Sequence, residues 1–387
     1  MLILSCITKF HAFQVAEQLQ KNNQLERFYT TYAAQKNPFW KAFLKRLDDE
    51  EISPDRLRTN IPLAIAKKTF PGPNWYWNRL FDQWVAHNLG GENFDVFMGW
   101  SGMSMLALQT AKKLGKKTIL VRSSAHIAVQ NRILQEEYQQ FGQAFSIPEK
   151  EIQTELQEYE VADYIEVPST FAYNSFVAQG IHPGKLLRHP LGVSLERFTP
   201  SGPIECSSEK TIQVIYLGNL SLQKGVQYLF MAARQFALNN RIFQFHFIGQ
   251  LMPEIKTWLD QNGLPENCQL HGFIPQQQLN LLLRPGAIGV VPTLHDGFSQ
   301  AIPQMLACHM PVIATPNSIA PDVIIDGENG FIVTARSPEA IVEKLQQLKD
   351  DPDLFIRMSH RARASVLNEL SWEHYGQRLS AFVRGIA

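Results

Sequence analysis

The sequence predicts an α/β protein made of two domains, each built on a mostly parallel β-sheet covered by helices. Short apolar segments alternate with segments of helical periodicity along the chain, which is the pattern of parallel sheets with helical crossovers. A stretch rich in Pro, Gly and Ser interrupts this alternation at 190–209, and the alternation then restarts. The 387 residues therefore divide into two units joined by a linker.

Four strand candidates occupy the first half. The apolar opening MLILSCIT is followed at once by a helical pattern in AFQVAEQLQKN. Three further strand candidates, at 95–100, 117–123 and 163–169, are each followed by a helical pattern, whereas residues 34–78 show no regular pattern. Glu136 and Glu137 fall in the second of these helical patterns and are expected on its solvated face. We expect this half to form one domain over 1–192.

The second half repeats the alternation. Strand patterns occur in TIQVIYLG, FQFHFIG, NCQLHGF, AIGVVPT, PVIAT and GFIV, with helical patterns between most of them, including QQQLNLLLRPG at 276–286 and FSQAIPQMLACH at 298–309. We expect a linker over 193–209 and a second domain over 210–365. In open parallel sheets, ligands bind at the carboxyl ends of the strands. The loops expected to line a cleft are those after Leu217, Ile248, Phe273 and Pro292.

Composition and missing motifs exclude several function classes. The 36 Lys and Arg residues balance 36 Asp and Glu, so no overall field attracts nucleic acid. The sequence contains no GxGxxG, P-loop or HExxH motif, which argues against dehydrogenases, kinases and zinc enzymes and predicts no bound metal or cofactor. The scattered cysteines and the lack of a signal peptide or long apolar run predict a cytoplasmic protein. The cysteines are Cys6, Cys206, Cys268 and Cys308.

The segment from Val290 to Thr315 is the main candidate for chemistry. A buried strand ends in a loop with Asp296 and Gly297, and a helical pattern follows. Glycine at such a turn lets backbone approach a ligand, and the free N–H groups of a helix start, here 298–301, suit a diphosphate. Gln304 lies eight residues after Asp296, so both side chains fall near one face.

Six motifs along the chain carry a resemblance to a known family. In order they read VPSTFAYNSF, LGVSLERFTP, YLGNLSLQKG, DGFSQAIPQMLACHMPVIAT, APDVIIDGENGFIV and LSWEHYGQRL. The sequence resembles the family-four retaining glycosyltransferases over its C-terminal half and the end of its N-terminal half. The resemblance implies the GT-B fold, in which two Rossmann-like domains with parallel sheets face a central cleft. It also implies a C-terminal helix, here 366–387, that crosses back to the first domain.

The implied activity is transfer of a hexose from a nucleotide sugar. The expected donor is a UDP-sugar, and the acceptor is a hydroxyl of a sugar, a lipid-linked compound or a small molecule. No metal is required, because a lysine neutralises the leaving diphosphate. The resemblance also implies a same-face mechanism, in which the leaving phosphate takes the proton of the acceptor.

The resemblance assigns donor contacts residue by residue. Lys224 matches the lysine at the donor phosphates, and its simpler interpretation is a solvated loop lysine. Asp296 matches a glutamate at the hydroxyls of the transferred sugar, with a helix cap as the alternative. Gln304 matches a second glutamate near the ribose, with an exposed helix residue as the alternative. Further expected donor contacts are Gly218, Asn219, Gly249, Ile274, Gly297, Phe298 and Ser299, of which Gly249 and Ile274 lie at the base.

Four positions depart from the family pattern. Asn219 stands where an arginine is usual and Ser299 where a glycine is usual, whereas Asp296 and Gln304 replace glutamates. One phosphate cation and one carboxylate are thereby absent. Two alternatives to a transferase follow: a non-catalytic relative that binds sugar nucleotides or glycans, and a GT-B nucleotide-sugar epimerase.

The first domain is expected to take the acceptor and to contact the donor sugar. His126 matches a family histidine near that sugar and is a catalytic candidate together with Lys224 and Asp296; its alternative is a structural role. His11 and Trp100 are candidates for the acceptor side, with a helix start and the core as their alternatives. Arg122 is placed to offset the arginine missing at Asn219.

One segment suggests contact with a membrane. NPFWKAFLKRL, at 37–47, combines aromatic residues with Lys and Arg, as a helix lying on an anionic membrane does. An ordinary surface helix has the same pattern. In the first case the protein sits peripherally at the inner face of the membrane, and a lipid-linked acceptor is favoured.

Overall fold

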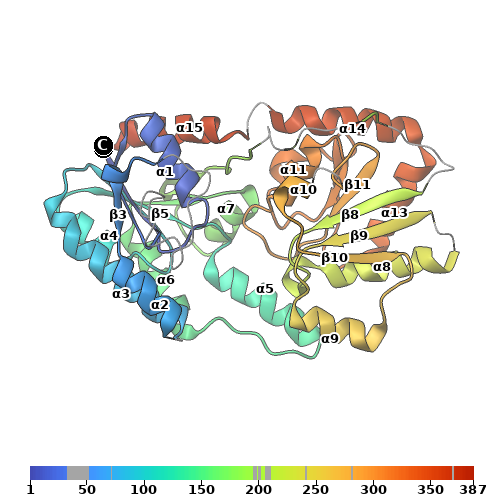
Figure 1. Cartoon of the computed structure of the whole chain (residues 1–387), viewed down its shortest axis with the longest axis horizontal. Coiled ribbons are helices and arrows are strands. Elements are labelled where there is room, and N and C mark those ends of the chain that lie inside the picture. The colour runs from blue at the N-terminus through green and yellow to red at the C-terminus, as the bar shows by residue number, and fades with distance from the viewer. Residues whose placement is uncertain are drawn as a thin grey trace.

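The computed structural model describes residues 1–32, 52–70, 72–194, 198, 202–204, 211–239, 242–279, 282–367 and 370–387. These residues form two α/β domains that lie side by side, with the N-terminal half on the left of Figure 1 and the C-terminal half on the right. The proposed membrane segment 37–47 and most of the expected linker lie outside the described residues. No helix of the described part is long and apolar enough to cross a membrane.

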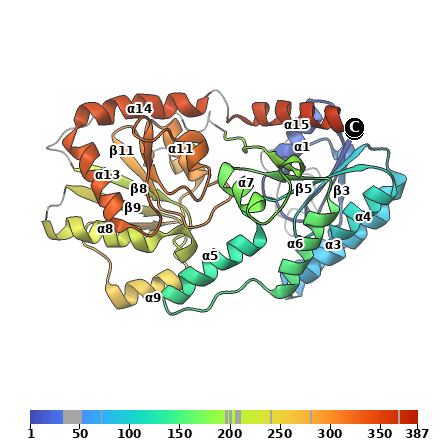
Figure 2. The ribbon, with the colours of Figure 1, turned by 180° about the vertical axis from the view of Figure 1, so that it is seen from behind.

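The first domain contains a seven-stranded parallel sheet in the order β3-β2-β1-β4-β5-β6-β7. Helices cover the sheet on both faces (Figures 1 and 2). Its strands are β1 (Leu2–Ser5), β2 (Leu25–Thr30), β3 (Leu57–Thr59), β4 (Val96–Trp100), β5 (Lys117–Val121), β6 (Tyr164–Val167) and β7 (Leu186–Arg188). Its helices are α1 (Ala12–Lys21), α2 (Ile61–Thr69), α3 (Asn74–Asn88), α4 (Met105–Lys113), α5 (Ile127–Gln140), α6 (Glu149–Val161) and α7 (Thr170–Val177).

The second domain contains a six-stranded parallel sheet in the order β10-β9-β8-β11-β12-β13. Its strands are β8 (Ile212–Leu217), β9 (Phe243–Ile248), β10 (Cys268–Gly272), β11 (Ala287–Val291), β12 (Val312–Ala314) and β13 (Gly330–Ile332). Its helices are α8 (Val226–Asn239), α9 (Pro253–Asn262), α10 (Gln276–Leu279), α11 (Ala301–Ala307), α12 (Ala320–Val323), α13 (Pro338–Asp350) and α14 (Pro352–Leu367). Short 3-10 helices occur at Pro54–Arg56, Leu89–Gly91, Pro183–Lys185 and Leu222–Lys224.

The two parallel sheets expected from the sequence are confirmed, but several elements were missed. Strand β2 contains the charged residues Glu26 and Arg27, which interrupt the apolar pattern of a strand. In the folded chain, Arg27 forms an ion pair with Glu92 at 3.2 Å. Strands β3 and β7 are three residues long, too short to show a periodicity. The expected helix at 276–286 is also wrong in extent, because α10 is described over Gln276–Leu279 and residues 282–286 are not helical.

The C-terminal helix α15 (Trp372–Ile386) crosses back to the first domain, as expected, and lies beside α1 in Figure 1. Gly376 faces α1 so closely that a Cβ atom there would lie 2.7 Å from that of Gln18. On the same helix, Tyr375 donates a hydrogen bond of 2.6 Å to the buried carboxylate of Glu166 in β6. Buried polar contacts of this kind hold the helix in one position, because a shifted helix would leave these polar groups without partners.

Helix α5 reaches from the first domain to the second (Figure 1). Its Glu137 is fully buried, which corrects the expectation of a solvated face. The carboxylate accepts hydrogen bonds from Gln227 at 2.7 Å and Tyr228 at 2.8 Å, and it pairs with Arg336 at 2.6 Å. All three partners belong to the second domain, so a buried charge is balanced only when the two domains are together.

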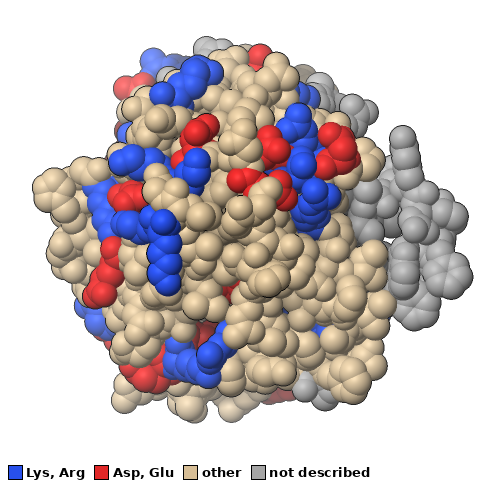
Figure 3. Space-filling model, turned by 90° about the vertical axis from the view of Figure 1, so that its left-hand side faces the viewer, with Lys and Arg blue, Asp and Glu red and all other residues tan. Residues whose placement is uncertain are grey.

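Charged side chains are mixed over the outer face of the first domain. In Figure 3, which shows this face, Lys and Arg lie next to Asp and Glu rather than in one field of a single sign. The chain as a whole has a formal net charge of zero. A surface of this kind has no long-range pull on a polyanion.

Candidate functional site

A cavity of about 570 Å³ opens at the carboxyl ends of the central strands of the second sheet. Strands β8, β9 and β11 all end at it, so one edge of the sheet supplies loops that are distant in the sequence. Eight residues expected to contact a donor line it: Gly218, Asn219, Lys224, Gly249, Ile274, Asp296, Ser299 and Gln304. The other lining residues were not assigned as donor contacts: Tyr216, Leu217, Ile248, Gln250, Phe273, Leu279, Val291, Gln300 and Ala301. Leu217, Ile248 and Phe273 precede loops that were expected to line a cleft, and Gln300 and Ala301 fall in the expected helix start at 298–301.

Two glycines allow the loops after β8 and β9 to meet at the cavity. Gly218 and Gly249 both have φ of 146°, a region that side-chain-bearing residues rarely adopt. A Cβ atom on Gly249 would lie 1.9 Å from the carbonyl oxygen of Gly218. Beneath them, the buried phenol of Tyr216 donates a hydrogen bond of 2.7 Å to the carbonyl of Asn219 and fixes the first loop. The cavity is therefore walled by backbone at this point.

Lys224 reaches the cavity from a short 3-10 turn that begins after Ser221. The hydroxyl of Ser221 accepts a hydrogen bond from the N–H of Lys224 at 3.3 Å. Gly225 ends the turn with φ of 68°, and a Cβ atom there would lie 1.9 Å from the carbonyl oxygen of Pro292. This turn thus packs against the end of β11, and the packing brings Lys224 to the loop that contains Asp296.

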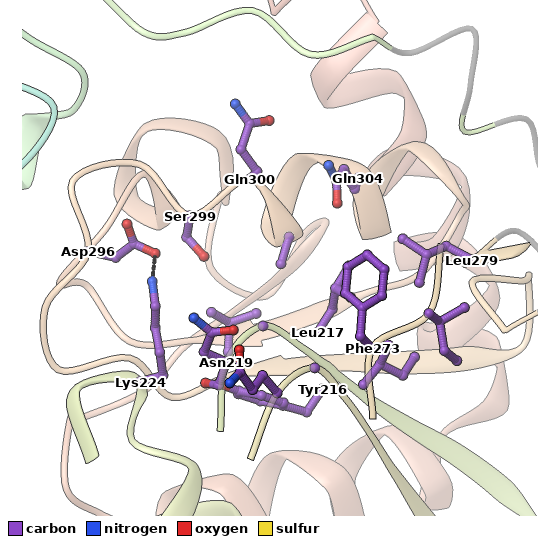
Figure 4. A pocket seen from close by; sticks show the side chains of 17 residues that line it. Tyr216, Leu217, Asn219, Lys224, Phe273, Leu279, Asp296, Ser299, Gln300 and Gln304 are labelled. Atoms are coloured by element: carbon purple, nitrogen blue, oxygen red, sulfur yellow. Dashed lines mark hydrogen bonds and ion pairs between the residues drawn. The ribbon is translucent and has the colours of Figure 1, made fainter. Parts of the chain in front are cut away.

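Lys224 and Asp296 form an ion pair in the cavity, drawn as a dashed line in Figure 4. Burial alone would raise the pKa of Asp296, but the charge and hydrogen bond of Lys224 outweigh it and hold the pKa below its usual value. The N–H of Phe298 adds a hydrogen bond of 3.3 Å to the same carboxylate. Asp296 is therefore ionised near neutral pH, and it serves both as a turn cap and as the partner of Lys224.

The cavity has one charged end and one apolar end. Figure 4 places Lys224 and Asp296 on one side, and Phe273 and Leu279 on the opposite side. Phe273 is 82% exposed although it is aromatic, so its ring is available to a ligand. Among the described lining residues, Lys224 is the only cation. A long ligand with an anionic part and a flat apolar part matches this polarity.

The expected helix start at 298–301 is corrected by the structure. Ser299 has φ of 60°, a left-handed conformation that a helix cannot continue, and α11 begins at Ala301. The carbonyl groups of Ser299 and Gln300 accept from the N–H groups of Ile302 and Gln304 at 3.1 and 3.3 Å. Phe298 is buried and does not line the cavity.

A close contact with the first domain requires a glycine at position 297. A Cβ atom there would lie 2.0 Å from the carbonyl oxygen of Ser123, in the loop after β5. Beside it, the buried His295 makes a contact of 3.1 Å between its Nε2 atom and the hydroxyl of Ser124. Burial and the charge of Arg122 lower the pKa of His295 to about 3, so its ring is neutral. His295 was missed because its partner is 171 residues away.

His126 lies at the start of α5 and caps it. Its Nδ1 atom accepts a hydrogen bond from the N–H of Ala128 at 3.3 Å. Its ring is buried against Tyr159 and Phe176, each with a centroid distance of 5.0 Å. Burial lowers the pKa of His126 to about 4. The structure therefore gives this residue a capping role, and it does not line the cavity.

The remaining candidates of the first domain are held in contacts of their own. His11 packs on Trp100 with ring centroids 5.4 Å apart, and burial lowers its pKa to about 4. Arg122 pairs with Glu155 at 2.9 Å and donates a hydrogen bond to Gln130 at 2.6 Å. Because this guanidinium is committed to Glu155, it does not replace the arginine missing at Asn219. His11, Trp100 and Arg122 do not line the cavity. Within the described residues, no group of three or more His, Cys, Asp and Glu is arranged to hold a metal ion.

Comparisons with known proteins agree with this architecture. Residues 204–365 match the family model described as glycosyl transferases group 1. An alpha-D-kanosaminyltransferase from Streptomyces kanamyceticus is 26% identical over 176 residues, which cover 45% of this chain and 45% of the relative. A putative colanic acid biosynthesis glycosyltransferase, WcaL from Salmonella typhimurium, is 23% identical over 54% of this chain and 53% of the relative. The chain thus spans about half the length of the curated relatives it matches.

Solved structures resemble the whole chain. Sucrose-phosphate synthase from Thermosynechococcus elongatus has a TM-score of 0.74 at 16% identity and covers 100% of this chain and 98% of its own. HepE from Anabaena, in a complex with UDP-glucose, has a TM-score of 0.69 at 11% identity and covers 99% of both chains. At these identities the likeness concerns the fold. Residues 204–365 therefore form a group 1 glycosyltransferase domain, within a chain that has the GT-B fold.

Proposed function

We propose that this protein is a retaining glycosyltransferase that moves a hexose from a UDP-sugar to a hydroxyl acceptor without a metal ion. The observation that carries the proposal is the cavity with Lys224 and Asp296 at one end and Phe273 at the other. Its polarity matches a nucleotide sugar, with the base at the apolar end and the diphosphate and sugar at the charged end. HepE, which shares the fold, holds UDP-glucose. The free thiols Cys6, Cys268 and Cys308 fit the reducing cytoplasm.

Lys224 has the central electrostatic role in this proposal. As the bond from the sugar to the diphosphate breaks, negative charge grows on the leaving oxygen, and a nearby ammonium group stabilises it. In the structure this ammonium is paired with Asp296. A donor diphosphate brings more negative charge than one carboxylate, so Lys224 turns towards it. Asp296 is then free to accept hydrogen bonds from the hydroxyls of the sugar.

The proton balance of the proposed reaction needs no separate base. The acceptor oxygen bonds to the anomeric carbon on the face from which the diphosphate leaves. The acceptor proton passes to the leaving phosphate oxygen, and the products are the glycoside and UDP. The task of the protein is then to align the reactants and stabilise charge. Lys224 and Asp296 are the described cavity residues with the charges for it.

A non-catalytic binding protein is the second candidate function. Asn219 and Gln304 line the cavity as neutral residues at positions where the resemblance implies charged ones. The leaving group is then stabilised by one side-chain cation instead of two. The two candidates predict the same donor binding and differ in turnover.

The test has two steps, both carried out with EDTA present. Calorimetry with UDP, GDP and ADP comes first, and we expect UDP to bind and Lys224→Ala to weaken it by about tenfold or more. Lys256→Ala, an exposed lysine on α9, is the matched control and keeps wild-type affinity. Turnover is then measured as the release of UDP from UDP-hexoses, and the sugar products are analysed.

The outcomes separate the functions. Glycoside formation with retained anomeric configuration supports the proposal. UDP binding without any turnover favours the non-catalytic relative, and a changed hexose without an acceptor shows an epimerase. Failure of all three nucleotides to bind would rule out the whole assignment.

A further inference from the structure

His295 is a histidine buried between the two domains, and it does not line the donor cavity. It lies directly before Asp296, in the loop after β11. Its Nε2 atom is 3.1 Å from the hydroxyl oxygen of Ser124, which belongs to the loop between β5 and α5 of the first domain. Its ring also meets the ring of Phe171 edge-on, with centroids 6.0 Å apart. Phe171 lies on α7, which is at the junction of the domains in Figure 1. The first domain therefore holds this ring by one polar and one aromatic contact.

Within the second domain, His295 contacts Gln223, the chain neighbour of Lys224 in the 3-10 turn. The side-chain amide of Gln223 donates a hydrogen bond of 3.0 Å to the backbone carbonyl of His295, and its nitrogen lies 3.5 Å from the ring atom Nδ1. The backbone carbonyl of Gln223 accepts a hydrogen bond from the N–H of Leu294 at 3.0 Å. These bonds join the turn that contains Lys224 to the loop that contains Asp296.

Asn317, in the loop after β12, supports the backbone on both sides of His295. Its side chain donates a hydrogen bond of 2.8 Å to the carbonyl of Leu294. Its own backbone carbonyl accepts a hydrogen bond of 3.0 Å from the N–H of Asp296. The backbone of this loop is thus fixed within the second domain, and the imidazole ring is the part of His295 that reaches the first domain.

A neutral imidazole suits this position between the domains. Burial, together with the charge of Arg122, lowers the pKa of His295, so the ring is neutral near pH 7. One nitrogen of a neutral ring donates and the other accepts, and the hydroxyl of Ser124 can do either, so their bond forms in one direction or the other. The contact between the domains therefore brings no additional charge beside Lys224 and Asp296.

A continuous series of contacts leads from the first domain to the ion pair of the donor cavity. It runs from Ser124 to His295 and from His295 to Gln223. His295 precedes Asp296 in the chain and Gln223 precedes Lys224, so each member of the ion pair directly follows one residue of the series. An ammonium group stabilises a leaving diphosphate only from a defined position, and a displacement of about 1 Å is costly.

We propose that His295 is a positioning residue, which sets Lys224 and Asp296 in place through the contact of the first domain at Ser124. The inference rests on the nucleotide-sugar transfer proposed above. It adds the residue through which contact between the domains reaches the charged end of the donor cavity. Phe273, at the apolar end, takes no part in this series of contacts. The contact at Ser124 therefore acts on the binding of the donor diphosphate and not on the binding of the base.

The test compares UDP, measured by calorimetry, with uridine, measured by saturation-transfer NMR, because only UDP has the diphosphate. Two neighbouring serines supply matched variants of the full chain. Ser124→Ala removes the hydroxyl that contacts His295, whereas Ser123→Ala removes a buried hydroxyl that has no hydrogen-bond partner among the described residues. We expect Ser124→Ala to weaken UDP binding about threefold and to leave uridine binding unchanged. Ser123→Ala should change neither.

Substitutions of His295 separate positioning from packing. His295→Phe keeps an aromatic ring beside Phe171 but loses the bond to Ser124, and we expect UDP binding to be about fivefold weaker. His295→Gln keeps a polar group that can reach Ser124, and UDP binding should stay within about twofold of wild type. In the Lys224→Ala background, His295→Phe should weaken UDP binding no further, because His295 acts through Lys224.

The outcomes distinguish the inference from the proposed function. UDP-specific weakening by Ser124→Ala and His295→Phe, absent in Ser123→Ala, supports the inference. Equal weakening of UDP and uridine, normal UDP binding by Ser124→Ala, or additive losses for Lys224→Ala and His295→Phe would overturn it while leaving the proposed function in place. If His295→Phe does not fold, the two serine variants decide the question. Absence of UDP binding by the wild-type protein would overturn the proposed function and the inference with it.

Discussion

The carboxylate of Glu137, on α5 of the first domain, pairs with the guanidinium of Arg336 in the second domain at 2.6 Å. Glu137 is fully buried, and Gln227 and Tyr228 complete its hydrogen bonds. A buried carboxylate with these partners ties the domains together in one arrangement. The same arrangement brings the loop after β5 against Gly297 and His295, beside the donor cavity.

Removing Glu137 should therefore destabilise the protein. Glu137→Ala removes the carboxylate that Arg336, Gln227 and Tyr228 contact, and we expect a loss of about 3 kcal/mol in the free energy of unfolding. Urea unfolding measures this loss. Glu136→Ala removes a half-exposed neighbour on the same helix and should change the free energy by less than about 0.5 kcal/mol. Equal effects of the two substitutions would contradict the role given to Glu137.

The pairing of Lys224 with Asp296 predicts a pH-dependent effect on stability. Because the pKa of Asp296 is held below its usual value, its ionised form stabilises the folded protein above the unfolded pKa, and this contribution is lost as pH falls through the lowered folded pKa. In Lys224→Met the carboxylate stays buried without its cation, so burial raises its pKa.

We expect Lys224→Met to be about 2 kcal/mol less stable than wild type near pH 7. This difference should shrink as pH falls towards about 4, because protonation removes the unpaired charge of the variant. Thermal unfolding of both proteins across this pH range measures it. A difference that is constant with pH would mean that the lysine acts through packing alone.

Gly297 allows the close approach of the two domains. Gly297→Ala places a Cβ atom 2.0 Å from the carbonyl oxygen of Ser123, so the domains must separate or the loops must shift. We expect a loss of about 2 kcal/mol in stability and a larger radius of gyration by small-angle X-ray scattering. Gly90→Ala, where nothing lies within 4 Å, is the control for glycine replacement. An unchanged radius with unchanged stability would show that this contact does not set the domain arrangement.

The left-handed backbone of Ser299 predicts an order of stability. Ser299→Gly relieves the strain of φ at 60° and should leave the protein as stable as wild type or up to about 1 kcal/mol more stable. Ser299→Val should cost about 2 kcal/mol, since a β-branched residue fits this conformation worst. At Gln300, whose φ is −53°, the same change to Val should cost less. The melting temperatures of the three variants measure this order. Ser299→Val as the most stable of the three would refute it.

Local periodicity was sufficient for the class of fold but not for all its elements. Apolar strands such as β4 and β11 are buried on both faces, so their sequences show an uninterrupted apolar run. Strand β2 was not predicted, because its charged residues find their partners only in the folded chain. The start of α11 was placed too early, because the backbone angle of Ser299 has no signature in its residue type.

The sequence by itself determined two parallel α/β units and a glycine-rich sheet edge with Lys224 and Asp296, and its resemblance to a known family implied the crossing C-terminal helix. These features depend on short-range patterns and on motifs of fixed spacing, which a sequence displays directly. Tertiary structure alone decided that Glu137 is buried and that Gly297 lies at the interface between the domains. Each of these depends on contacts between residues far apart in the chain, whose proximity is set by packing of the whole molecule rather than by any local pattern.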